Sequence, residues 1–245
     1  MKKYEVISFD MFQTLVDVNQ KKTDIWKAIF GAEYTKEKEE AGVRSFYRHL
    51  MPSYEQAVEP FQTMEEMYME CSKRIIEETG FAADPKQMAY QIMFYHGYAP
   101  FYEETFEVLK ELRENYRIVL STDSNQLMVA PLLKQIEVEE AFISDDMRCY
   151  KGERSGKFFQ ILLSKLRIAP EKVLHIGDSM ADVMGARMAG IDSCWINRDT
   201  KVWKGKVEPT YQITSLRDVL DLLSQNKEGR IANRIGRQIR PKLLI

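Results

Sequence analysis

The chain has 245 residues, of which 44% are hydrophobic and 29% are charged, the composition of an ordinary soluble globular protein. Its length allows one large domain, or a core domain with a smaller insert. The formal net charge of −2 gives no general electrostatic reason to bind nucleic acid or an anionic membrane surface. No apolar run approaches the roughly 18 residues of a membrane span, and the start of the chain is not typical of a signal peptide. We therefore expect a cytoplasmic protein without a nucleic-acid or membrane partner.

Short apolar, β-branched runs predict strands that are buried on both faces. They lie at residues 4–9, 117–121, 141–144, 173–177 and 193–196. Helical patterns lie between several of these runs, and a further one follows the last of them. They cover residues 103–114, 157–167 and 215–223. Strands that alternate with helices indicate an α/β fold with a Rossmann-like, mainly parallel sheet.

Residues 18–98 interrupt this alternation, because they contain helical patterns rich in Met and aromatic residues but no convincing strand. We interpret them as a helical insert, so the core consists of residues 1–17 and 99–225. Pro100 marks the expected return to the core. The three cysteines are far apart and odd in number, which indicates reduced thiols and no zinc cluster.

The end of the chain, residues 226–245, is a basic tail. It holds six Lys or Arg residues and one acidic residue, so it carries +5 and the rest of the chain −7. Arg230, Arg234 and Arg237 follow one another at helical spacing. The alternatives are a solvated tail, an amphipathic helix that contacts a partner or a second copy of the chain, and a linker to a further domain.

Polar residues end each predicted strand, and in an open parallel sheet these ends form the ligand-binding edge. They are Asp10, Thr122-Asp123, Ser144-Asp145-Asp146 and Gly177-Asp178-Ser179. Carboxylates that gather in a desolvated cleft repel one another unless a cation lies among them. Oxygen ligands without a His or Cys cluster favour a hard cation, so the pattern predicts a Mg²⁺ site.

Two segments resemble the motifs of a known family, the haloacid dehalogenase superfamily of hydrolases. Residues 7–17, with Asp10 after an apolar strand and Thr14-Leu15 behind it, resemble its first motif. Residues 173–182, with Gly177-Asp178 and Asp182, resemble its fourth motif. Thr122 and Lys151 lie where its second and third motifs place a hydroxyl residue and a lysine. The helical insert at 18–98 looks like the cap that one large subgroup carries at this position.

The resemblance implies a role for each of these residues. Asp10 would be a covalent nucleophile that forms an aspartyl intermediate with a small phosphorylated substrate. Mg²⁺ would bind Asp10, Asp178 and the backbone carbonyl of Phe12, with Asp182 in or next to its coordination sphere. Lys151 would neutralise the carboxylates and the transferring group. Thr122, with Asp123 beside it and Lys151, would contact the substrate phosphoryl group.

Phe12 departs from the family pattern, because most phosphatases of the family carry there an aspartate that transfers protons. A phenyl ring cannot do so, and such help is worth roughly 10²–10⁴-fold in rate. Three readings therefore stay open. The first is a phosphohydrolase whose leaving group is a good one, or which takes a proton from His49 or His96. The second is a 2-haloacid dehalogenase, and the third is a module that binds a phosphorylated ligand or a protein partner with little turnover.

Overall fold

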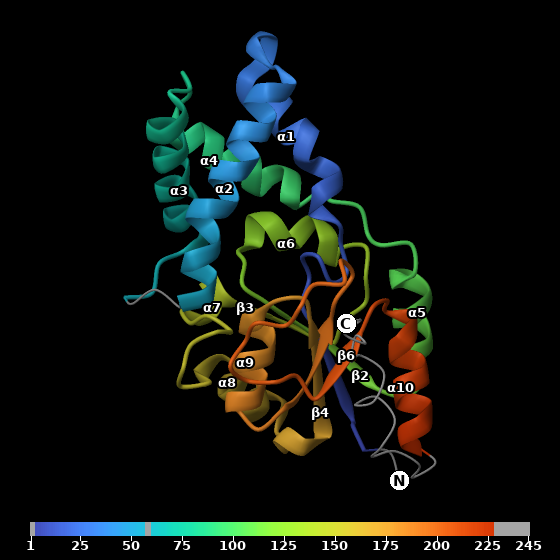
Figure 1. The fold of residues 1–245 in the computed structure, drawn as a ribbon. Coiled ribbons are helices and arrows are strands. Elements are labelled where there is room, and N and C mark those ends of the chain that lie inside the picture. The colour runs from blue at the N-terminus through green and yellow to red at the C-terminus, as the bar shows by residue number, and fades with distance from the viewer. Residues whose placement is uncertain (1–2, 57–59, 228–245) are drawn as a thin grey trace, which may run out of the picture.

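The computed structural model describes residues 3–56 and 60–227 (Figure 1). All neighbouring strands of its one six-stranded sheet run parallel, in the order β3-β2-β1-β4-β5-β6. The strands are β1 (Val6–Phe9), β2 (Arg117–Thr122), β3 (Glu140–Ile143), β4 (Val173–Gly177), β5 (Asp192–Ile196) and β6 (Tyr211–Ile213). The predicted α/β, Rossmann-like class is confirmed. The sequence did not indicate β6, because a three-residue, half-exposed edge strand carries no apolar run.

Helices of the core cover both faces of the sheet. They are α5 (Thr105–Arg113), α6 (Gln126–Leu133), α7 (Ser144–Met147), α8 (Lys157–Leu166), α9 (Met180–Met188) and α10 (Arg217–Lys227), with a short 3-10 turn at Pro170–Lys172. Successive strand residues point to opposite faces, and β1 shows the result. Val6 packs with Phe158 and Phe159 of α8, whereas Ile7 belongs to the larger cluster that contains Val108 of α5.

Between β1 and α5, the described residues form helices but no strand, apart from isolated bridges of Val16 with Phe12 and Phe101. The helices are η1 (Val18–Lys21), α1 (Lys22–Phe30), η2 (Gly31–Glu33), α2 (Lys36–Gln56), α3 (Met64–Thr79) and α4 (Pro85–His96). Thr63 and Glu66 form a capping box that starts α3, and Gly80 ends it in the left-handed conformation. Figure 1 shows that these helices stand over the carboxyl ends of the strands, so they face the predicted ligand-binding edge.

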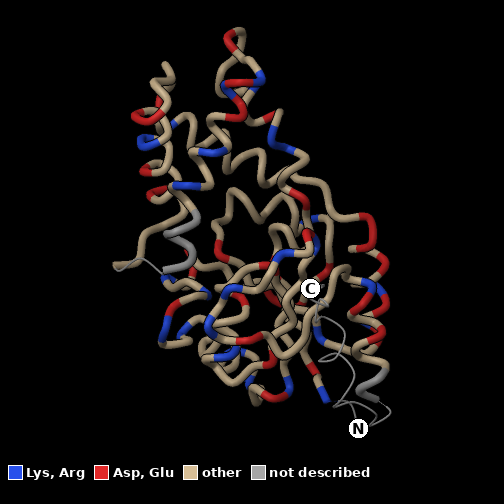
Figure 2. Tube along the Cα trace, in the orientation of Figure 1, with Lys and Arg blue, Asp and Glu red and all other residues tan. Residues whose placement is uncertain are grey.

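Within the part of the chain that the structure describes, no helix is long and apolar enough to cross a membrane. Lys or Arg and Asp or Glu positions are interspersed along the outer helices in Figure 2. Helix α10 runs to Lys227, two residues into the predicted basic tail. The remainder of that tail, residues 228–245, lies outside the described residues, so its alternatives stay as predictions.

Candidate active site

Three carboxylates meet at the carboxyl ends of the two central strands. Asp10 follows β1, Asp178 follows β4 and Asp182 lies in the first turn of α9; oxygens of all three lie within 4.8 Å of one another. Asp10 and Asp182 are buried, while Asp178 is partly buried. They converge because β1 and β4 are paired and parallel, so that their ends share one edge of the sheet.

Lys151 lies among these carboxylates. Its Nζ is 2.6 Å from Asp10 Oδ1 and 2.5 Å from Asp182 Oδ1, and all three side chains are buried. Burial by itself would lower the pKa of Lys151, but the charges of Asp10 and Asp182 outweigh it and hold that pKa above its usual range. The sequence placed Lys151 here only through resemblance, since it lies 141 residues from Asp10.

Asp123 attaches the Lys151 loop to the end of β2. Its Oδ1 accepts a 2.9 Å hydrogen bond from the backbone N–H of Lys151. Burial raises the pKa of Asp123 to about 7, although Lys151 acts in the opposite direction. Lys151 also packs against α9, where a Cβ on Gly185 would lie 1.9 Å from its carbonyl oxygen. The predicted substrate residue Asp123 thus contacts Lys151, which gives a structural reason for an acid at this position.

The loop after β4 is fixed largely by its own residues. Ser179 and Asp182 form a capping box, in which Asp182 Oδ2 accepts hydrogen bonds from the backbone N–H and the hydroxyl of Ser179. Gly177 is required beside them, because a Cβ there would lie 2.2 Å from Asp182 Cγ. Burial favours protonation of Asp182, but Lys151 and His175 hold its pKa well below the usual range.

A buried polar chain lies under the site, and the sequence patterns did not predict it. His175 Nε2 lies 2.9 Å from Asp182 Oδ1, and its Nδ1 lies 2.9 Å from the hydroxyl of Ser8. Ser8 lies 2.7 Å from Ser121 on β2. Since an ionised carboxylate can only accept, His175 donates from Nε2. The signal for this chain in the sequence is a polar residue inside each of three apolar strands.

The loop after β1 has an unusual backbone. Gln13 adopts a φ of +61°, a left-handed conformation that disfavours residues other than glycine. The turn closes when Gln13 N–H donates to Val16 O and Val16 N–H donates to Met11 O. Among the described residues, no hydrogen bond uses the carbonyl of Phe12. That oxygen therefore has the capacity to bind a cation.

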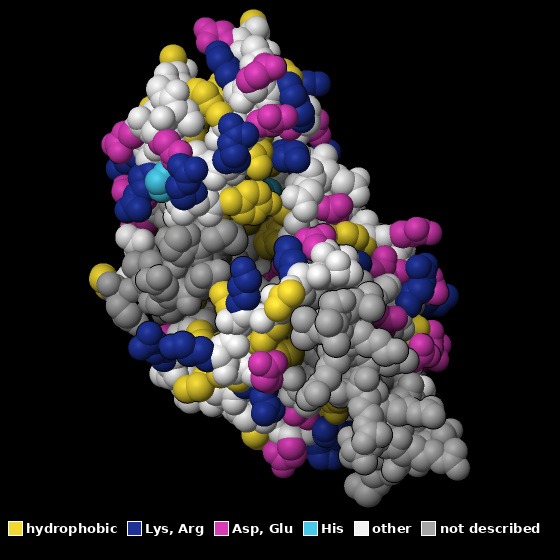
Figure 3. All heavy atoms as spheres, viewed as in Figure 1, with side chains coloured by type: hydrophobic (Ala, Val, Ile, Leu, Met, Phe, Trp, Pro, Cys, Tyr) yellow, Lys and Arg dark blue, Asp and Glu magenta, His cyan; other side chains and the backbone are white. Residues whose placement is uncertain are grey.

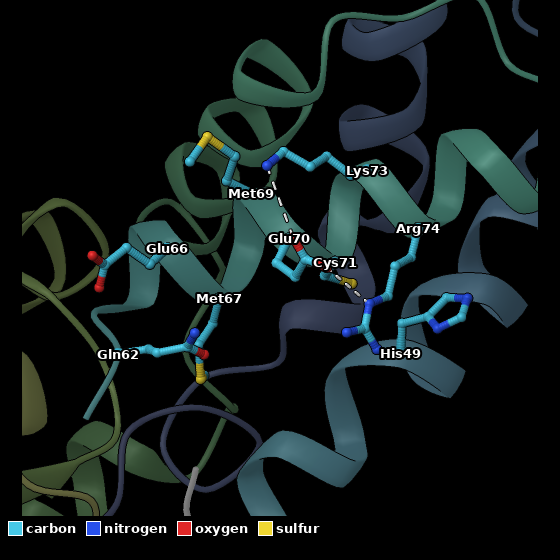
Figure 4. A pocket seen from close by; sticks show the side chains of 9 residues that line it. All are labelled: His49, Gln62, Glu66, Met67, Met69, Glu70, Cys71, Lys73 and Arg74. Atoms are coloured by element: carbon cyan, nitrogen blue, oxygen red, sulfur yellow. Dashed lines mark hydrogen bonds and ion pairs between the residues drawn. The ribbon is translucent and has the colours of Figure 1, made fainter. Parts of the chain in front are cut away.

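The two histidines that we considered as proton sources lie in different places. His96, at the end of α4, is buried with its ring centroid 6.0 Å from that of Phe12, and burial lowers its pKa to about 4. His49 on α2 instead pairs with Glu78 at 2.8 Å. His49 also lines a cavity of about 380 Å³ on α3, which none of the clustered carboxylates lines (Figure 4). Only His96 therefore contacts the residue that replaces the usual acid.

Two buried hydroxyls near the carboxyl ends of β1 and β2 have no hydrogen-bond partner among the described residues. They are Thr122 Oγ1, at the end of β2, and Thr14 Oγ1, in the loop after β1. Burying a hydroxyl without a partner is costly, which favours a ligand that supplies acceptor oxygens. Figure 3 shows a hollow with hydrophobic side chains at the centre of this face, between the helical segment and the core.

The residues present fit a hard cation. The carboxylate of Asp178 accepts no hydrogen bond within residues 3–56 and 60–227. Burial and the negative charges of Asp10 and Asp182 raise the pKa of Asp178 well above its usual value. A cation would remove this cost, and the oxygen donors match the preference of Mg²⁺. The oxygens of Asp182 already have protein partners, so Asp10 and Asp178 are the carboxylates with ligand capacity to spare.

Comparisons with known proteins find relatives in sequence and in fold. The chain is 22% identical over 235 residues to the putative HAD-hydrolase YfnB of Bacillus subtilis, covering 91% of this chain and 97% of that protein. A solved structure of YfnB bound to magnesium covers 91% of this chain and 99% of its own, with a TM-score of 0.78 at 20% identity. An L-2-haloacid dehalogenase of Xanthobacter autotrophicus covers 90% and 98%, with a TM-score of 0.75 at 15% identity.

A phosphatase relative matches a shorter segment. The pyrimidine 5'-nucleotidase PynA of Streptococcus pneumoniae is 34% identical over 89 residues, or 36% of this chain and 37% of that protein. Phosphatases and dehalogenases are thus both among the relatives, and the comparisons do not distinguish the two activities. The family model for haloacid dehalogenase-like hydrolases matches residues 4–190. The chain therefore belongs to the haloacid dehalogenase-like hydrolases.

Proposed function

We propose that the protein is a Mg²⁺-dependent phosphohydrolase that acts on a small phosphorylated metabolite through an aspartyl-phosphate on Asp10. The observation that carries this proposal is the cluster of Asp10, Asp178 and Asp182 around Lys151. A dehalogenase that uses one aspartate has no need of Asp178, whose buried charge is costly without a cation. We further propose that residues 18–98 act as a cap that selects the substrate.

Magnesium would be held by Asp10, Asp178 and the carbonyl of Phe12, and it would screen the nucleophile from the phosphate and stabilise the developing charge. Burial raises the pKa of Asp10, and Lys151, at 2.6 Å, opposes this shift by favouring the ionised carboxylate. Thr122 and Thr14 would donate their free hydroxyls to phosphoryl oxygens. Asp182 orients Lys151, because it accepts hydrogen bonds from Lys151 and His175 on the same oxygen.

The reaction has two steps. A carboxylate oxygen of Asp10 attacks phosphorus, the bond from phosphorus to the leaving-group oxygen breaks, and the leaving group departs with the electron pair. Water then attacks the phosphorus of the aspartyl-phosphate, which releases phosphate and restores Asp10. Phe12 cannot protonate the leaving group, so we propose a substrate whose leaving group is stable as an anion, such as an acyl or aryl phosphate.

A parallel screen tests this proposal. The purified protein is assayed with alkyl phosphates, aryl phosphates, acyl phosphates and 2-haloacids, each with Mg²⁺ and with chelator. We expect release of phosphate from the acyl or aryl substrates, abolished by chelator. If the missing acid limits the rate, the Phe12→Asp variant should hydrolyse alkyl phosphates about 10²-fold faster than the unmodified protein. A preference for alkyl phosphates in the unmodified protein would contradict the proposed leaving group.

The second candidate is a 2-haloacid dehalogenase. Phe12 favours it, because a halide leaves without a proton and so needs no acid at this position. Release of halide that is unchanged by chelator would establish this activity instead. No turnover in any arm, with the Phe12→Asp variant equally inactive, would indicate the binding module.

A further inference from the structure

One segment touches both loops that carry the proposed magnesium ligands. It is the stretch that ends β5 and follows it, residues 195–203. The indole Nε1 of Trp195 donates a 2.8 Å hydrogen bond to the backbone oxygen of Asp178. The Nη2 of Arg198 donates a 3.0 Å hydrogen bond to the backbone oxygen of Thr14. The loop after β4 and the loop after β1 are therefore attached to the same short piece of chain.

Arg198 is itself held on several sides. Its Nη1 lies 2.8 Å from Glu104 Oε1, and its guanidinium lies 3.5 Å from the ring centroid of Tyr102. The same oxygen of Glu104 also accepts from Ser215 at 3.3 Å and from the N–H of Leu216 at 3.4 Å. The side chains of Arg198 and Glu104 are 17% and 8% exposed. A planar guanidinium held in this way has little freedom to move.

Tyr102, which packs against Arg198, also contacts the loop after β1. The Tyr102 hydroxyl donates to Gln13 Oε1 at 3.1 Å, and the Tyr102 N–H donates to Leu15 O at 3.0 Å. Arg198 and Tyr102 together therefore contact three consecutive residues, 13–15, immediately after Phe12. This is also the place where the backbone is left-handed, so outside contacts compensate a conformation that Gln13 does not favour by itself.

The segment is also rigid with respect to the sheet. Asn197 and Lys201 exchange two 2.8 Å hydrogen bonds, from Asn197 Nδ2 to Lys201 O and from Lys201 N–H to Asn197 Oδ1. The N–H of Asn197 donates to Ile213 O of β6 at 2.8 Å, and Trp203 packs on Trp195 with ring centroids 4.8 Å apart. A displacement of one loop relative to the other would therefore break contacts in this segment.

We propose that Arg198 and Trp195 are positioning residues that fix the spacing between the carbonyl of Phe12 and the carboxylate of Asp178, and thereby set the affinity of the site for Mg²⁺. This inference rests on the proposed function, because it takes these two groups as magnesium ligands. Mg²⁺ demands nearly ideal octahedral geometry at short distances, so small displacements of its ligands weaken binding. Groups that orient metal ligands typically change metal affinity by 10–100-fold when they are replaced.

The test is isothermal titration of the full-length protein with MgCl2, without substrate. Arg198→Lys keeps the positive charge but loses the planar guanidinium and its stacking on Tyr102. We expect the Kd of this variant for Mg²⁺ to rise about 10-fold. Tyr102→Phe keeps the ring under Arg198 and removes only the hydroxyl, so its Kd should rise by a smaller factor. Arg217→Lys is the matched control, because Arg217 forms an exposed ion pair with Glu107 away from the site.

A second measurement separates positioning from general loss of structure. At saturating Mg²⁺, turnover of the Arg198→Lys variant should be within about 3-fold of that of the unmodified enzyme. The variant should instead need a higher Mg²⁺ concentration to reach its half-maximal rate. An unchanged Kd in both variants, in a protein that binds Mg²⁺, would overturn this inference alone. A lower Tm with unchanged Kd would overturn it too. Absence of Mg²⁺ binding to the unmodified protein would overturn the magnesium proposal, and this inference with it.

Discussion

The loops after β1 and β4 each present a carboxylate to the same cluster, yet they are held in different ways. The loop after β4 is mostly self-contained, with Ser179 and Asp182 in a reciprocal capping box at the start of α9. The loop after β1 contains a left-handed Gln13, and it is attached from outside by Tyr102 and Arg198. The first loop is held mainly by its own cap and by Trp195, 17 positions from Asp178, whereas residues about 90 and 184 positions away hold the second.

The two loops should therefore differ in how well they tolerate amino-acid substitutions. A loop that contains its own helix cap depends less on residues elsewhere in the chain. A loop that is fixed by distant contacts can accept an unusual residue, as Phe12 and Gln13 show, provided that those contacts persist. Substitutions at four positions test how each loop is held and what it contributes, from the largest expected effect to the smallest.

Asp10→Asn should lower turnover by about 10⁴-fold or more, because the amide is a poor nucleophile and cannot form the aspartyl-phosphate. Mass spectrometry after brief exposure to an acyl phosphate should find a phosphoryl adduct on Asp10 of the unmodified protein and none on the variant. Magnesium binding should weaken less than turnover. Full activity of the variant, or an adduct on another residue, would refute the role of Asp10.

Asp178→Asn changes the loop after β4 and should weaken Mg²⁺ binding by about 10²-fold, because a charged ligand becomes neutral. Raised Mg²⁺ should restore part of the turnover, which it would not do for Asp10→Asn. Titration calorimetry and initial rates over a range of Mg²⁺ concentrations measure both effects. If the two variants lost Mg²⁺ binding and turnover in equal proportion, the two loops would not have the separate roles proposed.

Asp123→Asn tests the attachment of Lys151 through the pH dependence of stability. The folded-state pKa of Asp123 is about 7, above the unfolded value of roughly 4, so the folded protein binds more protons between these values. Its contribution to stability is therefore present at low pH and is lost as pH rises towards 7, by up to about 4 kcal/mol. The free energy of unfolding, measured with denaturant in the presence of chelator, should differ less between pH 5 and pH 8 in the variant than in the unmodified protein. An identical difference in both proteins would contradict the raised pKa.

Gln13→Val should destabilise the protein by about 1–2 kcal/mol, because a β-branched residue is poorly tolerated at a φ of +61°. Gln13→Gly should stay within about 0.5 kcal/mol of the unmodified protein, because relief of the backbone offsets the lost hydrogen bond to Tyr102 and the greater entropy of glycine in the unfolded chain. Midpoints of thermal unfolding measure both. A valine variant as stable as the glycine variant would show that the left-handed backbone is not a constraint here.

Sequence patterns predicted five of the six strands of the sheet, and they placed Asp10 and Asp178 at the carboxyl ends of two of these strands. Those predictions succeeded because buried parallel strands are continuous apolar runs, and the first polar residue after each run marks the edge. Patterns failed where the signal was short or mixed. The edge strand β6 has three residues, and His175 and Ser8 are polar positions inside strands that otherwise resemble core.

The sequence by itself therefore determined the fold class and the positions of Asp10 and Asp178 after their strands, since each depends on a pattern of residues that are close along the chain. Only the tertiary structure decided that Lys151 lies between Asp10 and Asp182, that Asp123 holds Lys151, and that Arg198 holds the loop of Phe12. These contacts join residues 28 to 184 positions apart. No periodicity or local spacing encodes such pairs, because they arise when parallel strands bring distant loops to one edge of the sheet.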